Sequence, residues 1–159
     1  MTIIDGNNLL WALHEGFGER EIMTEVDLCR VLSQYFGQMG ETGQVVFDGS
    51  GPSDKSQFDA FDSLEVYFAG FHRDADSVVE EKITADTSPR RLTVVSSDRR
   101  LRKAAGERRA AAIKSEEFWQ QVQKELSRRK PRRREPEEKR EGLTDGETDQ
   151  WLEAFGLDE

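Results

Sequence analysis

Cysteine is nearly absent from this sequence, and so are the motifs of several common catalytic sites. Cys29 is the only cysteine among 159 residues, so no disulfide can form within the chain. With only His14 and His72 beside it, a four-ligand zinc site of cysteine and histidine cannot be assembled. The chain also lacks a GxGxxG fingerprint, a P-loop and a GxSxG nucleophile motif. These absences exclude zinc-finger, dinucleotide, P-loop and serine-hydrolase chemistry.

Long hydrophobic runs are missing too. No basic-then-apolar leader opens the chain, and no stretch of about 18 apolar residues occurs, so we expect a cytoplasmic protein without a membrane span. Apolar residues make up 35% of the chain and charged residues another 35%. This balance indicates a compact domain accompanied by a solvated segment.

Charge divides the chain into three parts. Residues 1–126 carry an excess of acid, residues 127–141 an excess of base, and residues 142–159 acid again, for a net charge of −9. We therefore predict a domain over 1–126, a basic flexible linker over 127–141 in which Pro131 and Pro136 discourage a helix, and an acidic tail.

The acidic tail contains one apolar cluster. Trp151, Leu152 and Phe155 fall on one face of a short helix, so the tail either docks on this domain or a partner, or is frayed with a weak apolar patch.

Short β-branched runs alternate with helical patterns in the domain. The expected strands lie at 2–5, 44–48, 64–70, 92–98 and 110–114. Helices are predicted at 24–40, 74–83, 98–105 and from Ser115 onward. The first of these opens with a capping box of Thr24 and Asp27. Such alternation predicts an α/β fold in which helices cover a parallel sheet on both faces.

Acidic residues follow the expected strands. Asp5, Asp48 and Asp98 each stand at the carboxyl end of a different strand, and Asp74 with Asp76 opens the helix after the third. Ligands of open α/β sheets bind beyond these strand ends. Several carboxylates directed into one crevice call for a hard divalent cation, so Mg²⁺ or Mn²⁺ is the expected cofactor.

Each of these acids also has a purely structural interpretation. Asp48 precedes GSGPSD and suits a turn, Asp74 and Asp76 complement a helix dipole, and Asp98 suits a helix cap. Asn7 and Asn8 tolerate a left-handed turn, which gives one of them a structural role.

Four motifs carry a family resemblance: IIDGNNL (3–9), VVFDG (45–49), FAGFHRDADSVVEEKI (68–83) and VVSSDRRLRKAA (94–105). Together they resemble the YacP-like branch of the NYN domains, within the PIN-like nuclease superfamily. The resemblance implies a Rossmann-like three-layer α/β/α sandwich with a sheet of about five strands. It also implies a Mg²⁺- or Mn²⁺-dependent ribonuclease, which we expect to be endonucleolytic.

The resemblance also implies site residues. Asp5, Asp76 and Asp98 match the catalytic, metal-binding acids of the family, with Asp74 beside them as a further ligand. Asn8 matches the asparagine of the DGxN motif, and Ser96 or Ser97 is expected to orient the phosphate or the metal.

The chain departs from the PIN-like pattern after Asp98. Many such sites place a further acid two or three residues on, where Arg100 and Leu101 stand here, so one firmly bound ion with a transient second one is expected. Arg99 and Arg100 are expected to hold substrate phosphates, and their structural interpretation is an exposed helix face. The basic run RRKPRRR (128–134) suits RNA or a ribosome that presents mRNA.

Two rival functions remain. The first is a PIN-like fold kept as a non-catalytic RNA- or ribosome-binding module, which the missing acid after Asp98 favours. The second is a phosphatase of the haloacid dehalogenase type, but Asn7 stands where that chemistry needs a second aspartate after Asp5.

Overall fold

The computed structural model describes residues 1–17 and 23–132. Within them the strands are β1 (Thr2–Asp5), β2 (Gly43–Phe47), β3 (Leu64–Phe68), β4 (Thr93–Val95) and β5 (Ala111–Ile113). The α-helices are α1 (Gly6–Phe17), α2 (Glu25–Met39), α3 (Ala75–Ala85), α4 (Arg99–Glu107) and α5 (Ser115–Arg132). Two short 3₁₀ turns, η1 (Ser56–Phe58) and η2 (Pro89–Arg91), lie in the connections.

The strands form one parallel sheet in the order β3-β2-β1-β4-β5. The chain builds the sheet outward from β1 through β2 to β3, then returns to the other side of β1 for β4 and β5. The switch in direction therefore lies between the carboxyl ends of β1 and β4. A ligand-binding crevice is expected at such a point in an open α/β sheet.

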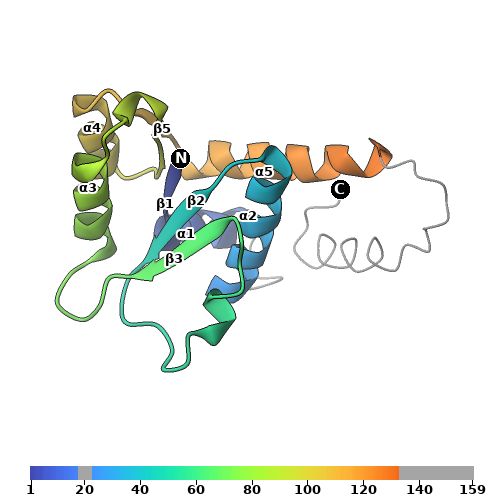
Figure 1. Ribbon diagram of the computed structural model, residues 1–159, viewed down its shortest axis with the longest axis horizontal. Helices are drawn as coiled ribbons and strands as arrows, with labels where there is room; N and C mark the ends of the chain where they lie inside the picture. The colour runs from blue at the N-terminus through green and yellow to red at the C-terminus, as the bar shows by residue number, and fades with distance from the viewer. Residues whose placement is uncertain (18–22, 133–159) are drawn as a thin grey trace.

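Helices cover both faces of this sheet, which makes a three-layer α/β/α sandwich (Figure 1). Because side chains alternate along a strand, each strand feeds two cores. One core packs α1, α2 and α5 against strand residues that include Ile4, Val45, Phe47 and Val95. The other packs α3 and α4 against Ile3, Val46 and Val94. Each such side chain contributes about 1.5–3 kcal/mol when fully buried.

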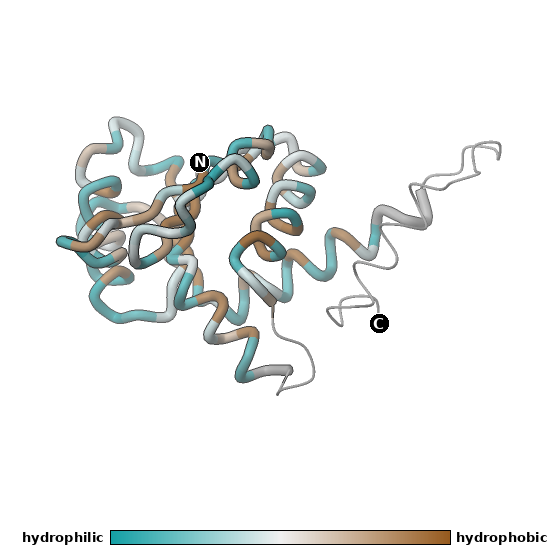
Figure 2. The backbone as a smooth tube through the Cα atoms, turned by 90° about the horizontal axis from the view of Figure 1, so that it is seen from below, coloured by the Kyte–Doolittle hydropathy of each residue, from teal (hydrophilic) through white to brown (hydrophobic). Residues whose placement is uncertain are grey.

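Hydropathy alternates along the helices, as their position on the sheet requires. Figure 2 shows teal and brown in turn along α5, whose buried residues are Phe118, Trp119, Val122 and Leu126. These positions recur every three or four residues, so one stripe of the helix meets the core. Cys29 belongs to the same core, and burial raises the pKa of its thiol to about 12. It is a packing residue rather than a nucleophile.

The predicted architecture is confirmed. All five expected strands form, with bounds a few residues shorter at the carboxyl ends of β3 and β4. The capping box is present, because the Thr24 hydroxyl accepts from the Asp27 amide and the Asp27 carboxylate accepts from the Thr24 amide. Asp74 and Asp98 cap α3 and α4.

Two local expectations differ from the structure. Asn7 and Asn8 lie in the first turn of α1, a helix that begins directly after Asp5, and neither adopts the left-handed conformation. Helix α5 continues to Arg132, so the first part of the segment predicted as a linker from residue 127 is helical. The rest of that segment and the acidic tail with its predicted short helix lie outside the described residues. Within the described part, no helix is long and apolar enough to cross a membrane.

Gly6 sets the entry of α1 against the sheet. A Cβ at this position would lie 2.5 Å from ring atoms of Phe47 and 3.0 Å from Val45. The helix can start immediately behind Asp5 only because no side chain occupies this space.

We predict that Gly6→Ala lowers the free energy of unfolding by about 1–3 kcal/mol, because the added methyl group must displace the buried Phe47 ring. Gly106→Ala is the matched control: Gly106 lies in α4 with open space around it, and alanine there is expected to raise stability by up to about 1 kcal/mol. Chemical denaturation measures both. Equal effects of the two substitutions would contradict the packing argument.

Candidate metal and nucleic-acid site

Asp5 and Asp98 stand on either side of the switch between β1 and β4. Asp5 is the last residue of β1, and Asp98 follows β4 as the N-cap of α4. By alternation from Ile3, Asp5 lies on the α3/α4 face of the sheet. Helix α3 presents Asp76 in its first turn on this same face. The fold thus brings the three predicted catalytic acids to one edge.

The Asp5 carboxylate is buried, with 5% of its surface exposed. The Ser96 hydroxyl donates to Oδ2 at 3.1 Å, and the Asn8 backbone N–H donates to Oδ1 at 3.4 Å. The pKa of Asp5 is raised to about 6, first by burial and then by the negative charges of Asp76 and Asp48. The two hydrogen bonds oppose this rise without cancelling it.

Asp76 and Asp98 influence one another directly. Burial is the first cause that raises the pKa of Asp76, and the charge of Asp98 is the second. Asp98 accepts a hydrogen bond from the Arg100 amide at 2.8 Å through Oδ1, and its own N–H donates to the Ser96 hydroxyl at 3.0 Å. Ser96 therefore bonds both Asp5 and Asp98 and fixes the distance between the ends of β1 and β4.

Asp48 and Asp74 both accept hydrogen bonds from backbone amides in the first turn of α3. Asp48 Oδ1 accepts from the Ala75 amide at 2.8 Å and so ties the end of β2 to the start of α3. Asp74 Oδ1 accepts from the Ser77 amide at 2.9 Å, a bond that caps α3 and, with the Ser77 side chain, lowers the pKa of Asp74. Its other oxygen lies 3.9 Å from the Arg100 guanidinium.

Asn8 and Ser97 belong to a hydrogen-bonded network that joins three elements. Asn8 Oδ1 accepts from the Ser97 amide at 2.9 Å and from the buried Ser115 hydroxyl at 2.7 Å. Ser97 Oγ accepts from the Ser115 amide at 3.1 Å and donates to Glu116 Oε1 at 2.9 Å. The network locks the starts of α1 and α5 to the end of β4.

Glu116 is a candidate site residue that the sequence interpretation did not name. It follows β5 by three residues and opens α5, so a fourth acid stands at the same edge as Asp98. The signal was available, because an acid after the fifth strand obeys the same strand-end rule that identified Asp5 and Asp98.

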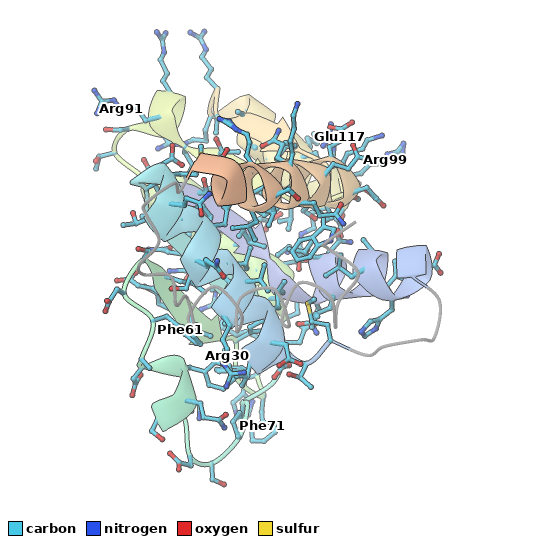
Figure 3. The ribbon with its side chains drawn as sticks, turned by 90° about the vertical axis from the view of Figure 1, so that its right-hand side faces the viewer. Arg30, Phe61, Phe71, Arg91, Arg99 and Glu117 are labelled. Carbon is cyan, nitrogen blue, oxygen red and sulfur yellow. The ribbon has the colours of Figure 1, made fainter. Side chains whose placement is uncertain are left out.

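The two predicted phosphate-binding arginines differ. Arg99 opens α4, is exposed, and projects from the surface in Figure 3. Arg100 instead directs its guanidinium at acids of α3, with its Nε 2.7 Å from Glu80. Arg99 is therefore the better placed of the two to meet a phosphate.

The carboxylates at this edge are of the type that binds a hard cation, but they do not surround a position for one. Among residues 1–17 and 23–132, no three Asp, Glu, His or Cys side chains already stand in an arrangement that could hold a metal ion. Within this part of the chain, no ion pair involves Asp5. Carboxylate oxygens are the ligands that Mg²⁺ and Mn²⁺ prefer. The residues fit such an ion in their chemistry, and ligation needs side-chain adjustment.

A five-stranded parallel sheet in this order, covered by helices on both faces and with acids near the switch between β1 and β4, defines an α/β domain. The profile of the YacP-like NYN domain family matches residues 2–155, so the chain belongs to that family. Family and fold were both predicted from the four sequence motifs, and both predictions are confirmed.

Solved structures of one relative share this fold. The crystal structure of Rae1 (YacP) from Bacillus subtilis superposes with a TM-score of 0.72 at 19% identity, over 98% of this chain and 92% of that one. The W164L mutant of the same protein gives a TM-score of 0.62 at 20% identity, over 99% and 97%. Among curated proteins no relative was found.

The raised pKa of Asp5 predicts how stability changes with pH in the metal-free protein. The folded state binds the Asp5 proton more tightly than the unfolded chain, whose pKa is about 3.9, so the charged form opposes folding. The shift of about two units corresponds to about 3 kcal/mol that is lost as the pH rises from about 4 to above 6. Asp5→Asn removes this titration.

We expect Asp5→Asn to be more stable than wild type by up to about 3 kcal/mol at pH 8 and to differ little at pH 4. Urea denaturation in EDTA at both pH values measures this difference. Asp62→Asn, at the amino end of β3, is the control for loss of one surface charge. A difference between Asp5→Asn and wild type that does not change with pH would contradict the assignment.

Proposed function

We propose that this chain is a metal-dependent ribonuclease that cleaves RNA phosphodiester bonds endonucleolytically. The observation that carries the proposal is the buried Asp5 carboxylate, which lies beside Asp76 and close to Asp98 at the switch point of the sheet. Such a cluster costs folding free energy, and a perturbed acid in a crevice of this kind is typical of a functional site. Membership of the NYN family and the PIN-like fold support nuclease chemistry in particular.

Asp5, Asp76 and Asp98 are the residues that would hold Mg²⁺ or Mn²⁺. When bound, such an ion would lower the pKa of a water and stabilise negative charge on the phosphate. Ser96 would keep Asp5 and Asp98 at a constant separation through its two hydrogen bonds. Glu116, held by Ser97, would add a carboxylate on the α5 side that can accept a proton or hydrogen-bond a water.

Positive charge is needed beside these acids, because the chain as a whole carries −9. Arg99 is placed to bind a phosphate next to the acidic edge, and the run RRKPRRR adds a sequence-independent contribution. Binding through such residues weakens steeply as salt rises.

Phe71 is the remaining substrate contact that we propose. It is 85% exposed and lies in the loop from β3 to α3, three residues before the Asp74 cap. The loop before it is held, since the Ala69 and Gly70 amides donate to Phe47 and Gly49 carbonyls. Phe71 follows β3 and Arg99 follows β4, and these two strands lie on either side of β1 in the sheet. A strand of RNA that meets both would run along the edge of the sheet past Asp5.

The test of the function is cleavage of a labelled single-stranded RNA, with a DNA of the same sequence beside it, in Mg²⁺, Mn²⁺ or EDTA. We expect cleavage of RNA that requires a metal ion, and a loss on the order of 100-fold or more in Asp5→Asn and in Asp98→Asn. Asp62→Asn, which removes the same charge at the opposite edge, is expected to cleave like wild type. A circular RNA distinguishes endonucleolytic from exonucleolytic cleavage.

The binding-module alternative predicts a different result in the same assay. No cleavage under any metal, together with salt-sensitive RNA binding that is lost when residues 133–159 are removed, would overturn the catalytic proposal. Cleavage that survives both substitutions would place the activity elsewhere than in the acidic edge.

Phe71→Ala is expected to weaken binding of single-stranded RNA by about fivefold or more, because stacking of a base on an aromatic ring contributes about 1–3 kcal/mol. Phe71→Trp should restore the affinity, since it preserves the stacking surface. Fluorescence anisotropy with a short RNA in EDTA measures binding without cleavage. Equal affinities of Phe71→Ala and wild type would remove Phe71 from the proposed RNA path.

A further inference from the structure

Arg100 is held in place by an acid that the catalytic proposal does not use. Its Nε donates to Glu80 Oε2 at 2.7 Å, and its Nη2 donates to Glu80 Oε1 at 3.0 Å. This two-point contact fixes the plane of the guanidinium, and Nη2 also lies 3.3 Å from the Ser77 hydroxyl. Glu80 and Ser77 both belong to α3, whereas Arg100 belongs to α4. The pair therefore spans the two helices on one face of the sheet.

The third nitrogen of the same guanidinium faces the candidate metal ligands. Nη1 lies 3.8 Å from Asp76 Oδ2 and 3.9 Å from Asp74 Oδ2. Asp76 also interacts with Asp98. Among the described residues, Arg100 is the cation that pairs with Asp76. The positive charge of Arg100 therefore lies close to carboxylate oxygens that a divalent cation would need.

Stability alone gives a weak reason for this arrangement. The side chains of Arg100 and Asp74 are 44% and 58% exposed, and exposed ion pairs contribute about 0–1 kcal/mol. The effect on a second cation is larger, because Arg100 both repels that cation and occupies Asp76. A unit charge a few ångströms from a divalent ion, screened close to the level of bulk water, changes affinity on the order of tenfold.

We propose that Arg100, positioned by Glu80, is a resident counter-cation of the acidic edge that competes with the divalent metal for Asp76 and thereby sets the metal affinity of the site. This inference rests on the proposed function, because it needs a metal to bind at Asp5, Asp76 and Asp98. It reverses the expected role of Arg100, whose guanidinium serves the carboxylates rather than a substrate phosphate.

The test is direct binding of Mn²⁺ to the full, EDTA-treated chain without RNA, followed by electron paramagnetic resonance of the free ion and by calorimetry. We expect Arg100→Gln to bind Mn²⁺ about tenfold more tightly than wild type. Arg100→Lys keeps the charge and should stay closer to wild type. Arg99→Gln removes the same charge one residue away, where no acid of the described residues is paired, and should change Mn²⁺ affinity much less.

A second measurement needs no variant. In wild-type protein labelled with ¹⁵N, addition of Mg²⁺ should shift the Arg100 Nε–H resonance, because occupation of Asp76 by the metal disturbs the guanidinium contact. Circular dichroism establishes that the variants remain folded.

Three outcomes would overturn the proposal. Equal or weaker Mn²⁺ binding by Arg100→Gln would make Arg100 an organiser of the ligands rather than a competitor. An equal gain in Arg99→Gln would show a general effect of net charge. If wild type and the variants all fail to bind Mn²⁺, as Asp98→Asn is expected to, the result would overturn both the metal site and the competition.

Discussion

Burial of the Asp5 carboxylate at the end of the central strand is the constraint on which the rest of this edge depends. Asp5 pairs with Val46 of β2, and the three residues before it pair with both β2 and β4, so the sheet holds the backbone at Asp5 in place. A buried charge must be compensated by hydrogen bonds or by an ion. Hydrogen bonds from the Ser96 hydroxyl and the Asn8 amide compensate part of the Asp5 charge. Both donors lie near Asp5 because α1 begins, and β4 ends, beside the end of β1.

The neighbouring acids increase this cost. Asp76 and Asp48 both act against ionisation of Asp5, and Asp98 acts against that of Asp76. Arg100 offsets part of the repulsion at Asp76 but makes no ion pair with Asp5 among the described residues. A fold selected only for stability would place fewer carboxylates here. Proteins retain such costly clusters where function requires them, which is why the arrangement supports the binding of a cation more than it supports the sheet.

Much of the fold could be predicted from the sequence, because its signals are local. The β-branched runs, the Thr24 capping box and the acids at helix starts each depend on a few adjacent residues, and together they predicted the parallel sheet and its acidic edge. What could not be predicted depends on contacts between distant residues. The bond from Arg100 to Glu80 and the network from Asn8 to Ser115 require α3, α4 and α5 to be packed already.

Helix α1 is an instructive intermediate case. Glycine and two asparagines after Asp5 favour a turn by local propensity, yet Gly6, Asn7 and Asn8 are helical in the structure. Tertiary contacts outweigh the propensity: Asn7 Oδ1 accepts from the Asp48 amide at 2.6 Å, and Asn8 bonds Ser97 and Ser115. The asparagines are therefore required for their side-chain amides at the edge, and the helix accommodates them.

The cap and ligand interpretations of the strand-end acids are not true alternatives. Asp98 caps α4 with Oδ1, but a carboxylate has about four acceptor positions, so one bond to an amide leaves most of its capacity for a cation. The capping bond also holds the side chain at the helix start and fixes its orientation before any ligand arrives. In Asp74 the same argument fails, because Oδ1 caps α3 while Oδ2 lies near Arg100 and the side chain is exposed. Asp98 is therefore better suited than Asp74 to the metal binding that we propose.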